Sequence, residues 1–414
     1  MTRGPEQRRD QPLLPMTLAP SQLEPELAEA YCQCADKNVL AALNPKIFFG
    51  YFSVCADPTQ GHGHDTTFPG LDWGQSAEAL LWLGRQAEVL ASWEYVKTFL
   101  RADGLLPFAI VPGQAGTTVQ MSLPKKTETY PFTVSANGGA YCHWFPGNPL
   151  LMLPNVTFIQ LADAIFRHTQ DAGWLAAQRP VLRQVTDWVL RQVTPLGLVP
   201  GGGFYVERPT RLEHDGVTQC YTAHALRLAT RLTGEPGYAA GADRITAGFR
   251  EKFWAGDHCV EYLNAEHGAI SHHGLTDVDW AAIATGMATP EQVQVLWPQL
   301  RHNGDFRYHG IPTGISTRPE TYEDWEMMYL DRHDLAAMGR AWYLEAWARS
   351  VMGDRAGVLE SLRQVARVGR ENNWYWRERY YSERSGDLGS YRINTYCEYP
   401  ANFIRIVHRF VLAG

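Results

Sequence analysis

The sequence lacks the marks of several common classes of protein. None of its apolar runs reaches the roughly 18 to 20 residues of a membrane-spanning helix, and the N-terminal stretch MTRGPEQRRDQPLLPM has no apolar core like that of a signal peptide. It also has no Walker-type glycine loop, no dinucleotide-binding fingerprint after a strand and no GxSxG motif. These absences argue against membrane, nucleotide and serine-hydrolase functions, and we expect a cytoplasmic protein.

The sequence is also short of positive charge and of paired cysteines. It has 37 Lys and Arg against 44 Asp and Glu, a formal net charge of -7. Such a balance offers no basic surface to nucleic acid or to anionic lipid. The 7 cysteines are scattered, and the closest pair, Cys32 and Cys34, does not have a zinc-site spacing. We therefore expect reduced, mostly buried thiols, and neither nucleic acid nor a membrane as a partner.

Aromatic residues are plentiful by comparison. The chain of 414 residues contains 14 Trp, 19 Tyr and 16 Phe, and hydrophobic residues make up 45% of it. This is more than enough for a core, so part of the aromatic surface is available for another purpose, such as stacking on the flat apolar faces of a ligand.

Helical periodicity dominates from about residue 22 onward. Residues 1–20 have no periodicity and are expected to form a disordered leader, and 21–414 are expected to form a single domain. About twelve amphipathic helices are predicted, at residues 22–43, 73–84, 87–102, 155–169, 174–194, 217–233, 237–254, 277–286, 290–302, 333–352, 355–370 and 400–412. No comparable series of strand patterns is found.

Short and long connections alternate between these helices. The long ones are rich in Gly, Pro, His, Trp and Tyr, and loops of such length are usually functional. A weak repeat supports this organisation, since YVKTFLRADGLLPF and WVLRQVTPLGLVPG share their apolar spacing, a glycine (Gly104, Gly197) and a proline (Pro107, Pro200). The pattern predicts an all-α fold, an (α/α)6 barrel of six helical hairpins with long loops on one face. A helical solenoid is the alternative.

Glu378 is the first candidate catalytic residue. It lies in WYWRERYYSERSG, where aromatic side chains crowd a carboxylate close to the C-terminus. A glycosidase needs two carboxyl groups, one to protonate the leaving oxygen and one to activate water or to attack carbon. Glu378 fits one of these roles, and a simple ion pair with Arg377 or Arg379 is the alternative interpretation.

The second carboxyl group is sought in YVERPTRLEHDGVTQCYTAHAL. Glu207, Glu213 and Asp215 precede a strong helical pattern, and Asp215 is the natural N-cap of that helix. Three acids in nine residues exceed what one cap needs, but the residues alone do not decide which of them is the general acid.

Asp72 and Trp73 start a helix after a loop that contains Gly and Pro. A carboxylate beside an indole suits sugar binding, although Asp72 is also a plausible cap. His62, His64 and Asp65 lie just upstream, but no further ligand has a recognisable metal-site spacing. We therefore predict no metal and no cofactor. Further substrate-binding candidates lie in the other aromatic, acidic loops: Trp144, Asp279, Trp280, Arg318, Glu320, Trp325, Trp376, Tyr380 and Glu398.

Together these segments resemble the six-hairpin, α/α-barrel glycosidases, which include glucoamylases, trehalases, the processing α-glucosidase and mannosylglycerate hydrolase group, and the α-rhamnosidases. FPGLDWGQSAEALLWLG is similar to the segment with the Trp/Asp pair at the −1 sugar, which implies that Asp72 and Trp73 bind substrate. EHDGVTQCYTAHAL resembles the glucoamylase stretch that follows the general acid, which places Glu213 in that role. Leu212 stands where the family has Trp, so Glu207 and Asp215 remain alternatives.

RERYYSERSG resembles the C-terminal loop that carries the general base in the glucosidase and trehalase group. The resemblance places Glu378 on the base, with Glu398 as the fallback. It implies hydrolysis with inversion, in which the two carboxyl groups stand roughly 6.5 to 9.5 Å apart. We therefore predict an inverting glycoside hydrolase that acts on a small glycoside or oligosaccharide, as a monomer or homodimer.

Other functions are compatible with the same barrel. Epimerases of the N-acylglucosamine 2-epimerase type use histidines as acid and base, and the loops contain His143, His214, His272, His273 and His309. A disaccharide phosphorylase would replace the base with a phosphate pocket. A non-catalytic carbohydrate-binding protein would need the aromatic side chains but no acid/base pair.

Overall fold

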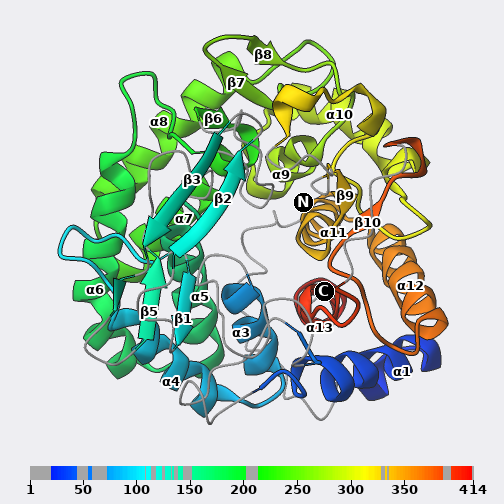
Figure 1. Cartoon of the computed structure of the whole chain (residues 1–414), viewed down its shortest axis with the longest axis horizontal. Coiled ribbons are helices and arrows are strands. Elements are labelled where there is room, and N and C mark those ends of the chain that lie inside the picture. The colour runs from blue at the N-terminus through cyan, green and yellow to red at the C-terminus, as the bar shows by residue number, and fades with distance from the viewer. Residues whose placement is uncertain are drawn as a thin grey trace, which may run out of the picture.

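The protein forms a ring of helical hairpins (Figure 1). The computed structural model describes residues 20–43, 55–57, 72–107, 109–112, 118–123, 126–131, 133–134, 139–142, 152–201, 213–327, 332, 335–385 and 393–412. Within these residues the inner helices are α3 (Asp72–Trp82), α5 (Leu153–Thr169), α7 (Gly216–Thr233), α9 (Asp277–Thr285), α11 (Gly339–Val351) and α13 (Glu398–Ile406). The outer helices are α1 (Pro25–Gln33), α4 (Gln86–Lys97), α6 (Ala172–Arg191), α8 (Pro236–Lys252), α10 (Pro290–Arg301) and α12 (Arg355–Glu371).

The inner helices close into a ring. Each of them contacts the next inner helix along the chain, and the last, α13, contacts the first, α3. A solenoid would leave its two ends apart. The prediction of an (α/α)6 barrel is therefore confirmed and the solenoid alternative is wrong.

Helix positions follow the predicted periodicity, while several helix ends differ. The helix predicted at 87–102 ends at Lys97, and the one predicted at 333–352 begins at Gly339. Helix α1 continues as a π-helical turn over Cys34–Val39, and α13 continues as one over Val407–Leu412. No helix in the described part of the chain is long and apolar enough to cross a membrane.

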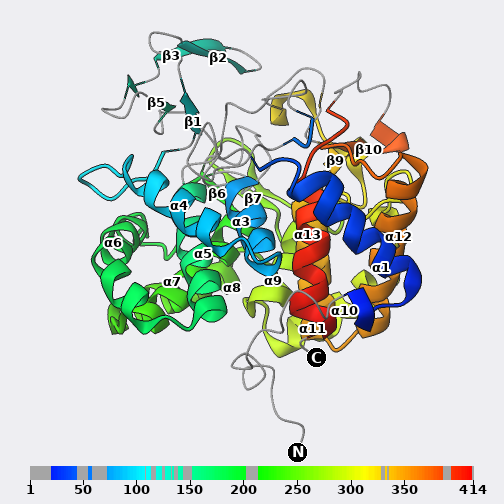
Figure 2. The same ribbon diagram turned by 90° about the horizontal axis from the view of Figure 1, so that it is seen from below.

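Short strands make up much of the long connections, which the sequence analysis missed. They pair antiparallel in the orders β1-β5-β4, β2-β3, β6-β7-β8 and β10-β9. Figure 2 shows β1, β2, β3 and β5 beyond the helix ends, on the side where α13 begins. The strands are β1 (Ala109–Pro112), β2 (Thr118–Leu123), β3 (Lys126–Pro131), β4 (Thr133–Val134), β5 (Gly139–Cys142), β6 (His214–Asp215), β7 (Tyr262–Asn264), β8 (Gly268–Ile270), β9 (Ala336–Ala337) and β10 (Tyr380–Tyr381).

The internal repeat corresponds to a repeated connection from an outer helix to the next inner helix. After α4, the amide of Gly104 donates to the carbonyl of Arg101 over 2.9 Å, and after α6 the amide of Gly197 donates to the carbonyl of Thr194 over 3.0 Å. Both glycines have positive φ, 94° and 72°. The repeat is thus a turn that ends an outer helix and directs the chain toward the ring.

A side-chain amide on the following inner helix holds each of these turns. Asn155 of α5 donates to the carbonyl of Gly104 over 2.8 Å and accepts from the amide of Leu106 over 3.0 Å. Gln219 of α7 makes the equivalent pair of bonds with the carbonyl and the amide of Val199, at 2.9 and 2.8 Å. We call these two arrangements the amide brackets. They tie the turn before each of these two long connections to the inner helix that follows it.

Substitution of Gly197 tests the close packing of this turn. A Cβ at Gly197 would lie 2.6 Å from the carbonyl oxygen of Arg244 on α8, whereas a Cβ at Gly234, which has a similar φ of 80°, would meet nothing within 4 Å. Gly234→Ala should lower the free energy of unfolding by about 1 kcal/mol through backbone strain alone. Gly197→Ala should cost about 2 kcal/mol more because a main-chain carbonyl must also move. Urea unfolding of both variants measures the difference, and equal losses would contradict the predicted clash.

The six cysteines whose side chains the structure describes are thiols and form no disulfide, as expected. Cys32 is exposed, and the other five are buried: Cys34, Cys55, Cys220, Cys259 and Cys397.

Candidate active site

The candidate site lies on the face of the barrel where the inner helices begin. Short turns, such as those at Gly84 and Gly234, join the inner helices α3, α5, α7, α9 and α11 to their outer partners at the opposite end. The long connections and the strands therefore collect where the inner helices have their N-termini (Figure 2). Helix N-termini carry partial positive charge, which favours carboxylates and sugar oxygens near them. We call this the loop face.

Glu378 is held rigidly on the loop face. The indole of Trp376 is fully buried and donates from Nε1 to the carbonyl of Val365 on α12 over 3.1 Å. Two residues later, the amide of Glu378 donates to the carbonyl of Ile393 over 3.2 Å. Tyr380 and Tyr381 then form β10, which pairs with β9 just before α11. The backbone on both sides of Glu378 is therefore fixed by neighbouring segments.

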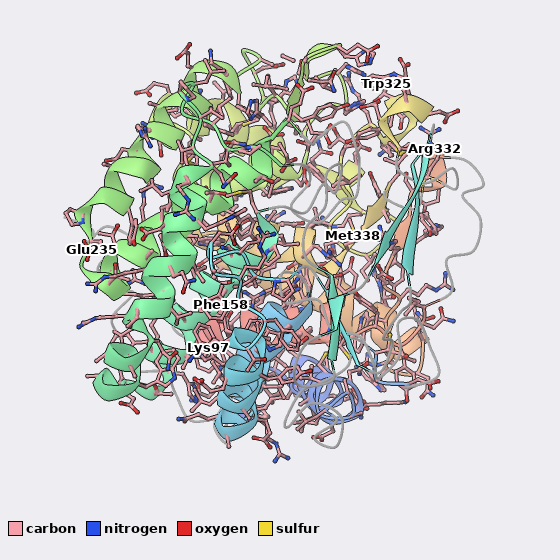
Figure 3. All side chains as sticks on the ribbon, turned by 60° about the vertical axis from the view of Figure 1, so that its left-hand side comes forward. Lys97, Phe158, Glu235, Trp325, Arg332 and Met338 are labelled. Carbon is pink, nitrogen blue, oxygen red and sulfur yellow. The ribbon has the colours of Figure 1, made fainter. Side chains whose placement is uncertain are left out.

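The carboxylate of Glu378 is buried, and only one of its two oxygens has a hydrogen-bond partner among the described residues. The residue is 5% exposed. Its Oε1 accepts from Nε of Arg379 over 3.1 Å, while Oε2 has no hydrogen-bond partner among the described residues. Arg379 is itself buried and also contacts the sulfur of Met338, which lies toward the middle of the view in Figure 3. A buried oxygen of this kind is costly unless water or a ligand supplies the missing bond.

Trp376 and Tyr380 pack against the scaffold on either side of Glu378. Trp376 is fully buried, and Gly369 of α12 makes room for its ring. The hydroxyl of Tyr380 accepts from the amide of Arg377 over 3.0 Å, and its ring packs edge-on against Tyr399 at 5.7 Å. Burial raises the pKa of Tyr380 to about 12. The prediction that the ring of Trp376 contacts substrate is therefore wrong, while the contact of Tyr380 stays a prediction.

The three acidic residues before α7 differ in their surroundings. Asp215 is fully buried and caps α7, with Oδ2 accepting from the amide and the hydroxyl of Thr218 at 2.7 and 2.8 Å. This confirms its role as N-cap and counts against Asp215 as the general acid. Glu213 is exposed directly before β6. Glu207 lies outside the described residues.

Glu398, the alternative candidate for the general base, forms an ion pair with Arg340. Both Glu398 and Arg340 are buried. Oε1 of Glu398 accepts from the backbone amide of Arg340 over 2.7 Å and from its Nε, and Oε2 accepts from Nη2 over 3.2 Å. Since both oxygens face the guanidinium, the structure assigns Glu398 to joining α13 to α11 and not to base catalysis or substrate binding.

The pair Asp72 and Trp73 opens α3, as predicted. The indole of Trp73 is fully buried, donates to the hydroxyl of Ser92 on α4 over 3.1 Å and stacks near Trp93 and Phe158. It thus faces the outer layer of the barrel, and its predicted contact with substrate is wrong. The side chain of Asp72 lies outside the described part of the structure.

Asp279 and Trp280 are also structural. Both oxygens of Asp279 accept backbone amides, from Cys259 and from Thr276, each over 2.7 Å, in a capping box at the start of α9. Burial raises the pKa of Asp279 to about 6. Trp280 is 1% exposed and packs against Phe306 at 5.6 Å. Their assignment to substrate binding is therefore wrong.

Other predicted binding residues remain accessible on the loop face. Arg318 and Glu320 are exposed. Trp325 is half-buried, donates from Nε1 to Glu323 over 2.7 Å and stacks on His267 at 3.7 Å. Figure 3 shows it near the edge of the molecule. These residues stay candidates, whereas Trp144 and the group His62, His64 and Asp65 lie outside the described residues.

The histidines considered for an epimerase occupy varied positions. His273 is fully buried. Nδ1 of His214 bonds to the carbonyl of Val199 over 3.0 Å, and exposed His309 pairs with Glu383 over 3.0 Å. His272 is exposed, and His143 lies outside the described residues. Because its ring is sealed from solvent, His273 does not contact a substrate in this structure.

Two buried carboxylates on this face were not among the predicted site residues. Glu261 and Glu326 are both 0% exposed. Glu261 accepts from the hydroxyl of Tyr322 at 3.0 and 3.1 Å, and Oε1 of Glu326 lies 2.9 Å from Nε2 of His273. A signal for Glu261 was present, since it sits in the apolar run CVEYL and would be buried in any strand there.

The interior of the ring is filled by a charged network. Glu78 of α3 accepts from Arg405 over 2.7 Å and also from Arg409, both in the last helical segment of the chain. Burial alone would raise the pKa of Glu78, but the two guanidinium groups lower it to about 2. The remaining cavity has a volume of about 50 Å³, enough for a few water molecules and too small for a sugar ring.

Solved structures of similar shape include glycosidases. A rhamnosidase from Klebsiella oxytoca with rhamnose bound matches with a TM-score of 0.61 at 14% identity, over 94% of this chain and 64% of that one. The GH63 mannosylglycerate hydrolase from Thermus thermophilus, in complex with glucose, matches with a TM-score of 0.59 at 11% identity, over 89% of this chain and 98% of that one. This chain has the six-hairpin glycosidase-like fold.

Sequence comparisons do not assign the chain to a particular family within this fold. No protein-family model matches the sequence, and no curated protein matches it significantly. A structure of a wild-type glycosidase shares the six-hairpin fold with a TM-score of 0.61 at 12% identity, over 93% of this chain and 97% of that one. The chain spans only 34% of a GH78 rhamnosidase from a Bacillus species, which it matches over 92% of its own length.

Proposed function

We propose that this protein is an inverting glycoside hydrolase in which Glu378 is the general base. The observation that carries the proposal is the carboxylate of Glu378, rigidly held on the loop face, 5% exposed, with Oε2 lacking a partner among the described residues. A base that activates water needs such a free oxygen, and the neighbouring Arg379 places a positive charge beside the carboxylate. The alternative, an ion pair with Arg379, is present in buried form and occupies Oε1 alone.

Glu213 is the proposed general acid, with Glu207 as the alternative. Glu213 is exposed directly before β6, close to the N-terminus of α7. To hold its proton near neutral pH it would have to be desolvated by the bound sugar or by a second carboxylate. Inversion would place it roughly 6.5 to 9.5 Å from Glu378, with room for the attacking water.

A small substrate suits the arrangement best. The interior of the ring is filled, so binding is restricted to the loop face, where Trp325 offers an aromatic ring and Arg318 and Glu320 offer groups for sugar hydroxyls. The similar structures with bound rhamnose and glucose suggest which sugars to test first. Rhamnosides, glucosides and mannosides, including mannosylglycerate, form a suitable panel.

The proposal is tested by following the anomeric proton of the released sugar by NMR. We expect one member of an α- and β-glycoside panel to be cleaved, with the first product formed in the inverted configuration. A product with retained configuration would exclude Glu378 as the base of an inverting mechanism. Epimerised sugar without cleavage would instead indicate the epimerase alternative, and binding without turnover across the panel would favour a carbohydrate-binding protein.

A further inference from the structure

A cluster of two histidines and one glutamate lies on the loop face. His272 and His273 precede α9, and Glu326 ends the 3-10 turn Asp324–Glu326. Each of these residues brings a potential ligand atom to within 4.8 Å of the others. The two histidine rings lie 4.1 Å apart, and Nε2 of His273 is 2.9 Å from Oε1 of Glu326.

The hydrogen bonds around His273 orient its ring. The hydroxyl of Thr321 donates to the carbonyl of Arg318 over 2.7 Å, so it must accept from Nδ1–H of His273 over 2.8 Å. In the neutral ring, Nε2 then carries the lone pair, and this lone pair faces Oε1 of Glu326 and, at 3.8 Å, Oε2 of Glu261. Electron-rich atoms that face each other in a fully buried place require a cation between them, either a proton or a metal ion.

We propose that His272, His273 and Glu326 bind a divalent transition-metal ion, and that Zn²⁺ fits them best. Imidazole nitrogen and carboxylate oxygen are ordinary zinc ligands, at about 2.0 to 2.2 Å from the ion, and the separation of Nε2 and Oε1 is close to that of two such ligands. The ion takes the place of a proton between these atoms. His272 is exposed, so the fourth position is open to water.

The surroundings supply the outer contacts that metal ligands usually have. Thr321 fixes the ring of His273, as described above, and the hydroxyl of Tyr262 donates to Oε1 of Glu326. The amide of Glu323 donates to the other oxygen of Glu326 over 2.8 Å. Such contacts orient ligands before the metal arrives and tune their affinity for it. The bound ion would fasten the turn that carries Trp325 to the segment that leads into α9.

The test uses the full-length chain without a histidine tag, after removal of metal with a chelator. We expect calorimetry to show one Zn²⁺ bound per chain and Co²⁺ to give visible absorption typical of a four-coordinate site. His272→Ala and Glu326→Gln should each weaken Zn²⁺ binding at least about tenfold. His302→Ala, which removes an exposed histidine outside the cluster, should change nothing.

Two outcomes would overturn the proposal. One is the lack of stoichiometric binding by the unaltered protein, which would leave His273 and Glu326 as a simple ion pair. The other is equal binding by the unaltered protein and by both cluster variants, which would indicate adventitious surface binding. His272 is exposed, so its alanine variant is expected to fold, and circular dichroism of the metal-free variants checks this.

Discussion

Glu378→Gln is expected to lower kcat on a cleaved glycoside by roughly 1,000-fold, because loss of a general base typically costs 100- to 10,000-fold. Glutamine has nearly the same shape, and its amide oxygen can still accept from Arg379, so the free energy of unfolding should change by about 1 kcal/mol or less. KM should change little because the amide still fills the same space. Steady-state kinetics and urea unfolding measure both quantities.

The matched control is Glu383→Gln. Glu383 lies five residues further along the same connection, but its side chain is 56% exposed and pairs with exposed His309. This variant should retain full activity. If Glu378→Gln kept its kcat, the buried carboxylate would be structural and the general base would have to be sought elsewhere on the loop face.

Glu398→Gln is expected to have the opposite effect, a loss of stability of about 3 kcal/mol. Arg340 and Glu398 are 4% and 3% exposed, and the guanidinium is directed at both carboxylate oxygens. Removing the negative charge leaves a buried cation without its carboxylate, which is more costly than losing the pair altogether. Urea unfolding should show a lower midpoint with an unchanged slope.

An exposed ion pair provides the comparison. Glu360 and Arg363 lie 3.5 Å apart on α12 with side chains 59% and 39% exposed, so Glu360→Gln should cost well under about 1 kcal/mol. The double variant Arg340→Met/Glu398→Gln should recover part of the stability lost in Glu398→Gln. If Glu398→Gln were as stable as the unaltered protein but inactive, Glu398 and not Glu378 would be the base.

The sequence predicted the helices well because their apolar faces repeat over many turns. The helix predicted at 155–169 runs from Leu153 to Thr169, and the one predicted at 217–233 runs from Gly216 to Thr233. The strands were missed although a signal was present, since Val119, Met121 and Leu123 alternate with polar residues in β2. Two-residue strands such as β9 leave no such signal, because they depend on pairing with distant segments.

The candidate site was only partly predictable, for a geometric reason. Neighbouring residues on a helix point about 100° apart, so composition cannot tell whether an indole such as that of Trp73 faces a ligand or the next helix layer. In an extended segment the direction alternates, which buries Trp376 and Glu378 while Arg377 between them is exposed. The chemistry of Glu378 could be suggested from its neighbours, but the unpaired oxygen depends on tertiary contacts.

The amide brackets separate what holds the barrel together from what faces a ligand. Asn155 and Gln219 lie on the helices that follow two of the long connections, and each side chain bonds to the turn that precedes its connection. Both ends of the connection are therefore held together. The entropic cost of closing a loop grows only slowly with its length. The segments between these points can therefore be lengthened, shortened or replaced with little effect on the stability of the ring. One scaffold can therefore carry different sets of loops, which is compatible with a fold that is shared at 11% to 14% identity.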